Sequence, residues 1–300
     1  MKFPLLLVAT LLSSACSPAT SSNEAPEAAR TTTQSQPGKQ GKGKKGKHQK
    51  AYLPAGLREV GRVADEVREG SGLCPAPQPG TYFTFGDQGN PPTVFRIDGT
   101  GKLLGQFDLG APNRDWESLT RDDSGNYYVG DCGNNAFDRR DLALLRFRPD
   151  NPSQVGRIAF RYADQTEFPP ARKKESNFDC EATLWHGGQV WLFTKDPKDA
   201  ICKVYTVPDQ PGTQTARLVM QLALPGRVTD AALSPNGRRL ALLAREEVFV
   251  LEGSNWDAIL KATPRRIGLD GAGQTEGAAF KDDNTLLIST EQGRLYELGL

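Results

Sequence analysis

A short motif, in which an acidic residue precedes small and apolar residues, recurs along the chain and restricts its fold more than any other feature. It occurs as REGSGL, DWESLT, DCEATL, TDAALS and TEGAAF, with the acids at Glu69, Glu117, Glu181, Asp230 and Glu276. A turn follows each motif, and strand-like runs such as TYFTFG, NYYVG and QVWLFT follow the turns. Repeats of about 40 to 50 residues with four strands each are typical of β-propeller blades. The repeat therefore predicts an all-β propeller in which each motif begins one blade.

The number of motifs predicts five blades over residues 51–300. A six-bladed ring is the alternative, because the interval between Glu117 and Glu181 is longer than the others and has room for an extra half blade. The fifth blade lacks a fourth strand before Leu300. We expect the run LREVGRV at residues 57–63 to pair there as the outer strand, because this closes the ring and removes open sheet edges.

The first residues have the order of a bacterial export signal. Lys2 precedes an apolar run that ends in small residues and Cys16, as in secretory signals. We predict a lipoprotein signal peptide over residues 1–16, with the lipid on Cys16. Plain secretion is the alternative, since Ser13 stands where the lipobox usually has Leu. No Asp follows Cys16, which favours an outer-membrane anchor facing the periplasm or the cell surface.

Residues 17–50 contain Ser, Thr, Pro, Gly, Gln and Lys with hardly an apolar side chain. Such a segment cannot bury enough surface to offset the entropy of ordering. It is predicted to be a disordered tether. Its lysines either attract it to anionic headgroups or only keep it solvated, and the sequence leaves both interpretations open.

The charge of the chain limits its partners. The formal net charge is +1, but residues 17–50 are basic and residues 51–300 have an acidic excess. A folded part with more acidic than basic side chains lacks the positive face that nucleic acid requires. We therefore expect no nucleic-acid partner. The expected partners of a monomeric protein are the membrane, through the lipid anchor, and an envelope protein or a small anionic ligand.

One carboxylate per blade at the same register implies a cation. The first strand of a propeller blade lines the central channel, so the five motif acids are predicted to meet around one axis. Like charges at short range cannot all stay ionised. Hard oxygen ligands without His or Cys favour calcium over zinc, so Glu69, Glu117, Glu181, Asp230 and Glu276 are the predicted metal site. The alternative is a solvated channel whose carboxylates accept backbone N–H groups.

The motifs also resemble known families. REGSGL with FGDQGNPPTVFRIDGTG, DWESL with YYVGDCGNN, FDCEA with LFTK, and TEGAAF look like bacterial SdiA-regulated and esterase-like or phytase-like propellers. This resemblance covers residues 57–300 and implies an extracytoplasmic protein, in some members with calcium in the channel. One oxygen ligand per blade is similar to the five-bladed calcium-activated nucleotidases, which hold a central calcium. Their phosphate-contacting residues cannot be placed in this sequence.

Loops between second and third strands are expected at the same channel mouth as the motif acids. They bring a second set of polar residues to this rim: Asp87, Asn90, Asp131, Asn134, Asn135, Arg140, Lys195, Asp196 and Glu291. The repeated sequence Gly-Asp-x-Gly-Asn forms either a bend that contacts ligand or a tight turn that caps its own strand. Arg139 and Arg140 either clamp a phosphate or carboxylate or belong to a solvated loop.

Two functions of different classes follow. The chain has His48 and His186 as its two histidines and no G-x-S-x-G elbow, which argues against a serine esterase. The leading hypothesis is a lipid-anchored, calcium-binding propeller that acts as a binding or interaction module at the bacterial cell envelope. The alternative is a metal-dependent phosphoester hydrolase with its site at the channel mouth, because metal-assisted hydrolysis needs no histidine.

Four cysteines follow Cys16. In an exported protein they permit up to two disulfides in three pairings: the residues are Cys74, Cys132, Cys180 and Cys202. For Cys180, next to a motif acid, a buried free thiol is as consistent with the sequence as a bridge.

Overall fold

The computed structural model describes residues 53–196, 198 and 200–300. The predicted signal peptide (residues 1–16), the lipidated Cys16 and the predicted tether (residues 17–50) lie outside the described residues. None of the helices in the described part is long and apolar enough to cross a membrane.

Short antiparallel strands dominate the described residues, which confirms the all-β prediction. One four-stranded sheet contains β2 (Gly70–Pro75), β3 (Thr81–Gly86), β4 (Thr93–Asp98) and β5 (Leu103–Asp108). Another contains β14 (Val228–Leu233), β15 (Arg239–Ala244), β16 (Glu247–Glu252) and β17 (Arg265–Gly268). The helical segments among these residues are one turn each, η1 (Lys173–Glu175) and α1 (Trp256–Leu260).

An eight-stranded sheet consists of two antiparallel halves. One half contains β6 (Trp116–Arg121), β7 (Tyr127–Asp131), β8 (Ala143–Arg148) and β9 (Asn151–Tyr162), and the other contains β10 (Cys180–His186), β11 (Gln189–Thr194), β12 (Cys202–Pro208) and β13 (Gly212–Leu222). The halves join where β9 and β13 pair in parallel, Ile158 opposite Gly212 and Tyr162 opposite Ala216. Both strands are long enough to run past their antiparallel partners, so their free edges meet.

The N-terminal strand completes the last sheet. β18 (Thr275–Asp282), β19 (Thr285–Thr290) and β20 (Arg294–Gly299) are followed in the sheet by β1 (Leu57–Arg62). β1 pairs antiparallel with β20, Leu57 opposite Leu298 and Arg62 opposite Arg294. The run predicted to close the ring therefore pairs at the predicted place.

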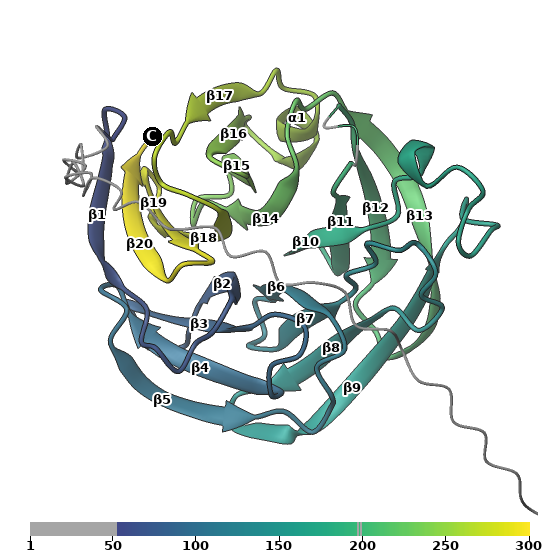
Figure 1. Cartoon of the computed structure of the whole chain (residues 1–300), viewed down its shortest axis with the longest axis horizontal. Coiled ribbons are helices and arrows are strands. Elements are labelled where there is room, and N and C mark those ends of the chain that lie inside the picture. Colours follow the sequence, from purple (N-terminus) through teal and green to yellow (C-terminus); the bar gives the residue numbers. More distant parts are fainter. Residues whose placement is uncertain (1–52, 197, 199) are drawn as a thin grey trace, which may run out of the picture. The chain divides into compact units, whose positions relative to one another are not determined.

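The sheets stand around a common centre (Figure 1). Their first strands, β2, β6, β10, β14 and β18, contact one another in sequence around this centre, and β18 contacts β2. Because each first strand starts at the same end, its first residues share one mouth of the channel and its last residues share the other. This β-propeller arrangement places the motif acids.

Apolar side chains fill the spaces between neighbouring sheets. Trp116 of β6 is fully buried, and its ring meets Phe85 of β3 edge to face at 5.4 Å. The four cysteines, Cys74, Cys132, Cys180 and Cys202, are also buried and are free thiols. The structure therefore contains thiols where the sequence permitted disulfides.

Candidate functional site

Three first strands contain a β-bulge at the same place, and the bulged residue is a motif acid. The antiparallel register shifts between Trp116 and Ser118 in β6, between Cys180 and Ala182 in β10, and between Thr275 and Gly277 in β18. The residues skipped by the shift are Glu117, Glu181 and Glu276. A bulge leaves one residue unpaired and changes the direction of its side chain. The repeated bulge thus places three carboxyl groups at the channel mouth.

A polar cavity with a volume of about 90 Å³ lies at this mouth. It brings four of the predicted metal residues together with four of the predicted rim residues. They are Glu69, Glu117, Glu181 and Glu276 from the first set, and Asp87, Asn135, Lys195 and Glu291 from the second. Gly70, Ser71 and Gln274 complete the lining.

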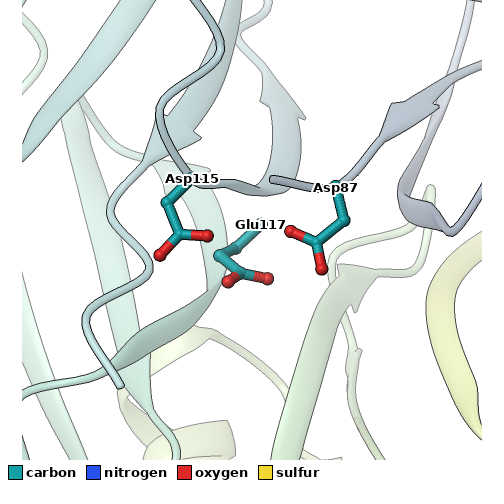
Figure 2. A group of neighbouring side chains, drawn as sticks. All are labelled: Asp87, Asp115 and Glu117. Atoms are coloured by element: carbon teal, nitrogen blue, oxygen red, sulfur yellow. The ribbon is translucent and has the colours of Figure 1, made fainter. Parts of the chain in front are cut away.

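Asp87, Asp115 and Glu117 form the tightest group of carboxylates at the mouth. Each offers one oxygen that lies within 4.8 Å of the others, and Figure 2 shows the three carboxylates facing a shared space. Asp115 and Glu117 are buried and Asp87 is partly exposed. In the described part of the chain, no hydrogen bond reaches the carboxylate oxygens of Asp115 or Glu117.

Burial and mutual repulsion raise the pKa values of these acids. For Glu117 the pKa lies well above its usual range because of burial and the nearby charges of Glu181 and Asp87. Burial, with Asp87 beside it, raises the pKa of Asp115 to about 6. Burial, partly opposed by a hydrogen bond from Gln274, raises the pKa of Glu276 to about 7. Without a cation, part of this cluster therefore holds protons near neutral pH.

Lys195 partly compensates one side of the cavity. Its Nζ lies 2.9 Å from Oε1 of Glu181, and burial opposed by the charges of Glu181 and Asp179 leaves its pKa above the usual range. Asp179 accepts the backbone N–H of Asn134 at 2.6 Å. Among the described residues lining the cavity, Lys195 is the one with a cationic side chain. The charge of Lys195 also acts on Asp87, and that of Arg139 acts on Asp115. No ion pair within the described part of the chain, however, includes Asp87, Asp115 or Glu117.

Asp230 lies apart from the other motif acids. In β14 the register shifts between Val228 and Asp230, so Thr229 takes the bulged position. The Asp230 carboxylate is fully buried and accepts the backbone N–H groups of Ala231 (2.8 Å), Ala278 (2.8 Å) and Leu73 (3.3 Å). It therefore connects three first strands inside the channel and does not line the cavity. For this one acid the structure has the backbone-bonded arrangement that the sequence left open.

Other predicted rim residues stabilise the loop after β7. Asp131 accepts the N–H of Asp115 at 3.1 Å and pairs with Arg139 at 3.0 Å. The Asn134 side-chain N–H donates to the carbonyl of Phe178, and Asn134 Oδ1 accepts the backbone N–H of Arg139. These residues orient the segment behind the cavity without lining it.

The remaining rim residues lie beside the cavity or away from it. The Asn90 side-chain amide donates to two residues that line the cavity, the Glu69 carboxylate at 3.5 Å and the Asp87 backbone carbonyl at 3.1 Å. Asp196 accepts backbone N–H groups of its own loop. Arg140 lines a different cavity, where its guanidinium lies over the ring of Phe168.

The DCGNN turn after β7 fits closely against the carboxylates. A Cβ on Gly133 would lie 2.4 Å from both Asp115 Oδ2 and Glu117 Oε1. The Gly133 N–H also donates to the backbone carbonyl of Asp115 at 3.2 Å. Glycine at this position therefore lets the loop approach and hold the two acids in place.

Sequence reasoning missed Asp115, Asp179 and Gln274. Each stands two residues before a motif acid and directly before the first residue of β6, β10 or β18. In DWE, DCE and QTE this spacing predicts a second polar side chain at the mouth. This polar residue two positions before the motif acid is visible in the sequence, and it would have predicted Asp115 as a site residue.

Comparisons with known proteins do not assign the chain to a family. No protein-family model matches the sequence, and no curated protein matches it significantly. Among solved structures, the chain is similar to the PQQ-bound aldose sugar dehydrogenase from Streptomyces coelicolor, with 14% identity and a TM-score of 0.47 over 83% of this chain and 99% of that one. It is also similar to hydrazine synthase from Kuenenia stuttgartiensis, with 11% identity and a TM-score of 0.46 over 79% and 97% of the two chains. Neither similarity indicates the activity of this chain.

Proposed function

We propose that residues 51–300 form a five-bladed propeller that binds a divalent cation, calcium, at its acidic channel mouth. The proposal is based on the group of Asp87, Asp115 and Glu117. Each offers one carboxylate oxygen, and these oxygens lie within 4.8 Å of one another. Two of them are buried without hydrogen-bond donors in the described residues. An uncompensated buried charge is costly, and a bound cation removes this cost.

The chemistry of the donors favours calcium. Asp87, Asp115 and Glu117 supply hard oxygens. Glu69 and Glu276 line the acidic cavity together with Asp87 and Glu117. Calcium takes six to eight oxygen ligands in flexible geometry, so water completes a set provided by three carboxylates. The donors at the cavity include no His or Cys among the described residues, and such ligands would favour zinc. The residues present therefore fit calcium.

The strand pairing supports the proposal of five blades. Four groups of consecutive strands, β2–β5, β6–β9, β10–β13 and β14–β17, and one group closed by β1 each contain four strands. The parallel contact of β9 and β13 joins the outer edges of two such groups. We interpret each group as one blade, and the longer interval between Glu117 and Glu181 as the extension of β9 and the loop after it.

The sequence supports a place for this module at the cell envelope. The proposed lipid on Cys16 and the tether of residues 17–50 would hold the propeller near an outer membrane. The resemblance to SdiA-regulated and phytase-like propellers belongs to the same proposal and is based on the motif sequences. Replacing Cys16 by Ser tests the anchor: the protein should move from the membrane fraction to the soluble exported fraction, and unchanged fractionation would contradict lipidation.

A second function, metal-dependent phosphoester hydrolysis, is favoured by a basic cavity next to the acidic one. This cavity has a volume of about 220 Å³ and shares Asn135 and Lys195 with the acidic cavity. Lys173 and Lys174 of η1 also line it. An anionic group bound by these lysines would lie next to the proposed cation. The two cavities together therefore have the parts that metal-assisted attack on a phosphoester requires.

Calcium titration combined with a phosphoester panel separates the two functions. The metal-free full chain is titrated with calcium by calorimetry, and a panel of phosphomonoesters and phosphodiesters is then assayed with calcium present. A binding module should take up calcium and hydrolyse none of the panel. Hydrolysis that depends on calcium and falls in Lys174→Gln would identify the enzyme. An absence of calcium binding would contradict both.

A further inference from the structure

A further cavity, the outer cavity, lies on the outer part of the propeller, away from the channel. Its volume is about 620 Å³, within the range of small-molecule sites. Its walls come from the loop before β8, the end of β9 and the segment that follows β9. The proposed calcium site shares no lining residue with it.

The lining of this cavity is positively charged. Arg139, Arg140 and Arg161 line it, whereas no Asp or Glu of the described residues does. Arg139 is neutralised by Asp131 at 3.0 Å and Asp141 at 3.1 Å. Arg140 and Arg161 form no ion pair in the described part of the chain. Two guanidinium groups are therefore available to an anion.

Two acids near the cavity are already paired. Asp164, beside the cavity, binds Lys203 at 2.9 Å and accepts the hydroxyl of Tyr205. Asp141 pairs with Arg114 at 2.8 Å as well as with Arg139. The cavity of Arg238 and Arg239 differs, because Glu252 and Asp283 line it too and Glu252 pairs with Arg239. Charge of one sign is thus a particular property of the outer cavity.

Aromatic and amide groups fix the shape of the outer cavity. The Arg140 guanidinium carbon lies 4.2 Å from the centre of the Phe168 ring, a cation–π contact that holds the side chain. Gln165 donates to the carbonyl of Phe137 at 3.1 Å, and its buried Oε1 has no hydrogen-bond partner. A buried polar atom without a partner is costly. A ligand with an N–H or O–H group would satisfy it.

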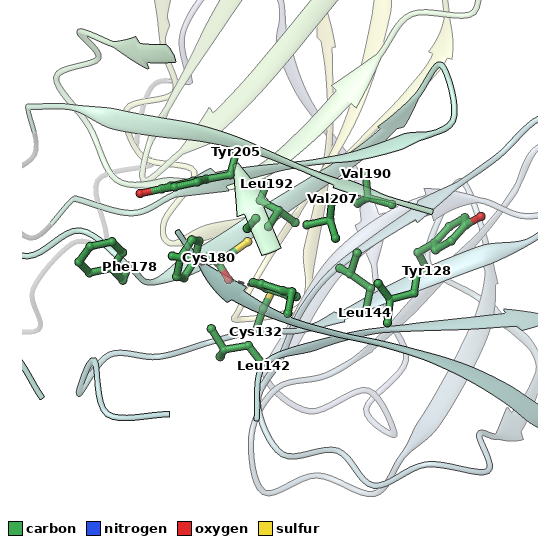
Figure 3. Packing of buried hydrophobic residues seen from close by; sticks show 14 of the residues in the cluster. Tyr128, Cys132, Leu142, Leu144, Phe178, Cys180, Val190, Leu192, Tyr205 and Val207 are labelled. Atoms are coloured by element: carbon green, nitrogen blue, oxygen red, sulfur yellow. Dashed lines mark hydrogen bonds between the residues drawn. The ribbon is translucent and has the colours of Figure 1, made fainter. Parts of the chain in front are cut away.

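The inner wall is largely apolar. Leu142, Phe160 and Tyr162 line the cavity and belong to the buried cluster between the two halves of the eight-stranded sheet. Figure 3 shows this cluster, with Leu142 from the loop before β8 and Tyr205 from β12. The Tyr162 ring packs on Tyr205 at 4.7 Å and on Phe160 at 5.7 Å. A flat apolar group can therefore pack on a wall that is already formed.

We propose that this outer cavity binds a small ligand in which a carboxylate or phosphate is joined to a planar apolar group. Arg140 and Arg161 bind the anionic oxygens, because guanidinium groups form paired, charge-assisted hydrogen bonds with them. Phe160 and Phe168 contact the planar group. Gln165 Oε1 accepts a hydrogen bond from a donor on the ligand.

Calorimetric titration of the full chain with benzoate and with phenyl phosphate tests the proposal, with neutral benzamide and inorganic phosphate as comparison probes. At least one of the first two should bind with a Kd of about 1 mM or tighter. The comparison probes should bind about tenfold more weakly, because each lacks one half of the ligand. The stronger of benzoate and phenyl phosphate identifies the anionic group.

Variants show whether the binding is in this cavity. Arg140→Gln and Arg161→Gln should each weaken the binding by about tenfold or more, since each removes a charge-assisted hydrogen bond. Arg238→Gln, an exposed arginine of the other arginine cavity, is the matched control and should bind as the parent does. Absence of binding by both anionic probes would overturn the proposal. So would equal binding of benzamide, or parent affinity in both cavity variants while their circular dichroism matches the parent's.

Discussion

Asp230 inside the channel and the carboxylates at its mouth are buried alike and are stabilised differently. Both oxygens of Asp230 accept backbone N–H groups, from three first strands. Asp115 and Glu117 are also buried, yet no donor reaches their carboxylates in the described residues, and each has another carboxylate within 4.8 Å. Burial alone therefore does not distinguish a structural acid from a ligand. The distinction is whether the protein itself supplies the donors.

The largest expected effect on stability belongs to Asp230→Asn. The amide has one oxygen, so at least one backbone N–H among Ala231, Ala278 and Leu73 loses its acceptor and faces an NH₂ group. We expect the free energy of unfolding to fall by about 3 kcal/mol, measured by urea denaturation. Asp115→Asn is the matched change at the mouth, and the metal-free protein should keep or gain stability. If both variants lose the same free energy of unfolding, Asp230 and the acids at the mouth do not differ in the way proposed.

Calcium should stabilise the parent protein by about as much as Asp230→Asn destabilises it. A ligand that binds only the folded state adds about 2.7 kcal/mol at a hundredfold excess over its Kd. The melting temperature should therefore rise with added calcium and fall with a chelator. Asp230→Asn should show the same rise, because its carboxylate is not a ligand. A melting temperature that responds to neither treatment would count against the metal.

Glu117→Gln should separate metal binding from stability. It removes one charge from the cluster, so the metal-free protein should be equally stable or more stable by about 1 kcal/mol, while the calcium affinity falls. Glu276→Gln should act in the same direction with a smaller effect. Glu181→Gln should differ from both and destabilise the metal-free protein, because Lys195 loses the partner at 2.9 Å.

Glu252→Gln is the control for these changes. Glu252 is half exposed and pairs with Arg239 and Arg265, and such surface pairs contribute little. It should alter neither calcium binding nor stability beyond about 0.5 kcal/mol. If it matches Glu117→Gln in both measurements, the cluster has no special role.

The sequence predicted the strand composition, the closing pair of β1 and β20, and the meeting of four motif acids at one mouth. These features depend on local alternation and on a repeat, which a sequence displays directly. It misplaced Asp230 among the mouth acids, because a bulge shifted by one residue puts Thr229 in the equivalent position. The motif TDAALS resembles TEGAAF in residue type, but the register that separates them comes from the pairing of β14 with β15. The sequence also misplaced Arg140 at the rim. Its loop turns the Arg140 side chain toward Phe168 instead.

The acids at the mouth should also make the stability of the protein depend on pH. The raised pKa values of Asp115, about 6, and Glu276, about 7, mean that the folded state holds more protons than the unfolded chain between about pH 4 and pH 7. The stability of the metal-free protein should therefore decrease as the pH rises through this window. Saturating calcium should reduce this decrease, and calcium affinity should weaken below about pH 6 because protons compete for the ligands. Denaturation curves at several pH values measure both trends.

Anomalous X-ray diffraction from crystals soaked in calcium is the direct test of the proposed calcium site. We predict an anomalous peak in the space shared by Asp87, Asp115 and Glu117, with oxygen ligands at about 2.4 Å and water on the open side. Crystals of Glu117→Gln should lose or weaken this peak. A well-ordered channel mouth without the peak in the parent, with Lys195 or protons alone compensating the acids, would contradict the proposed calcium site.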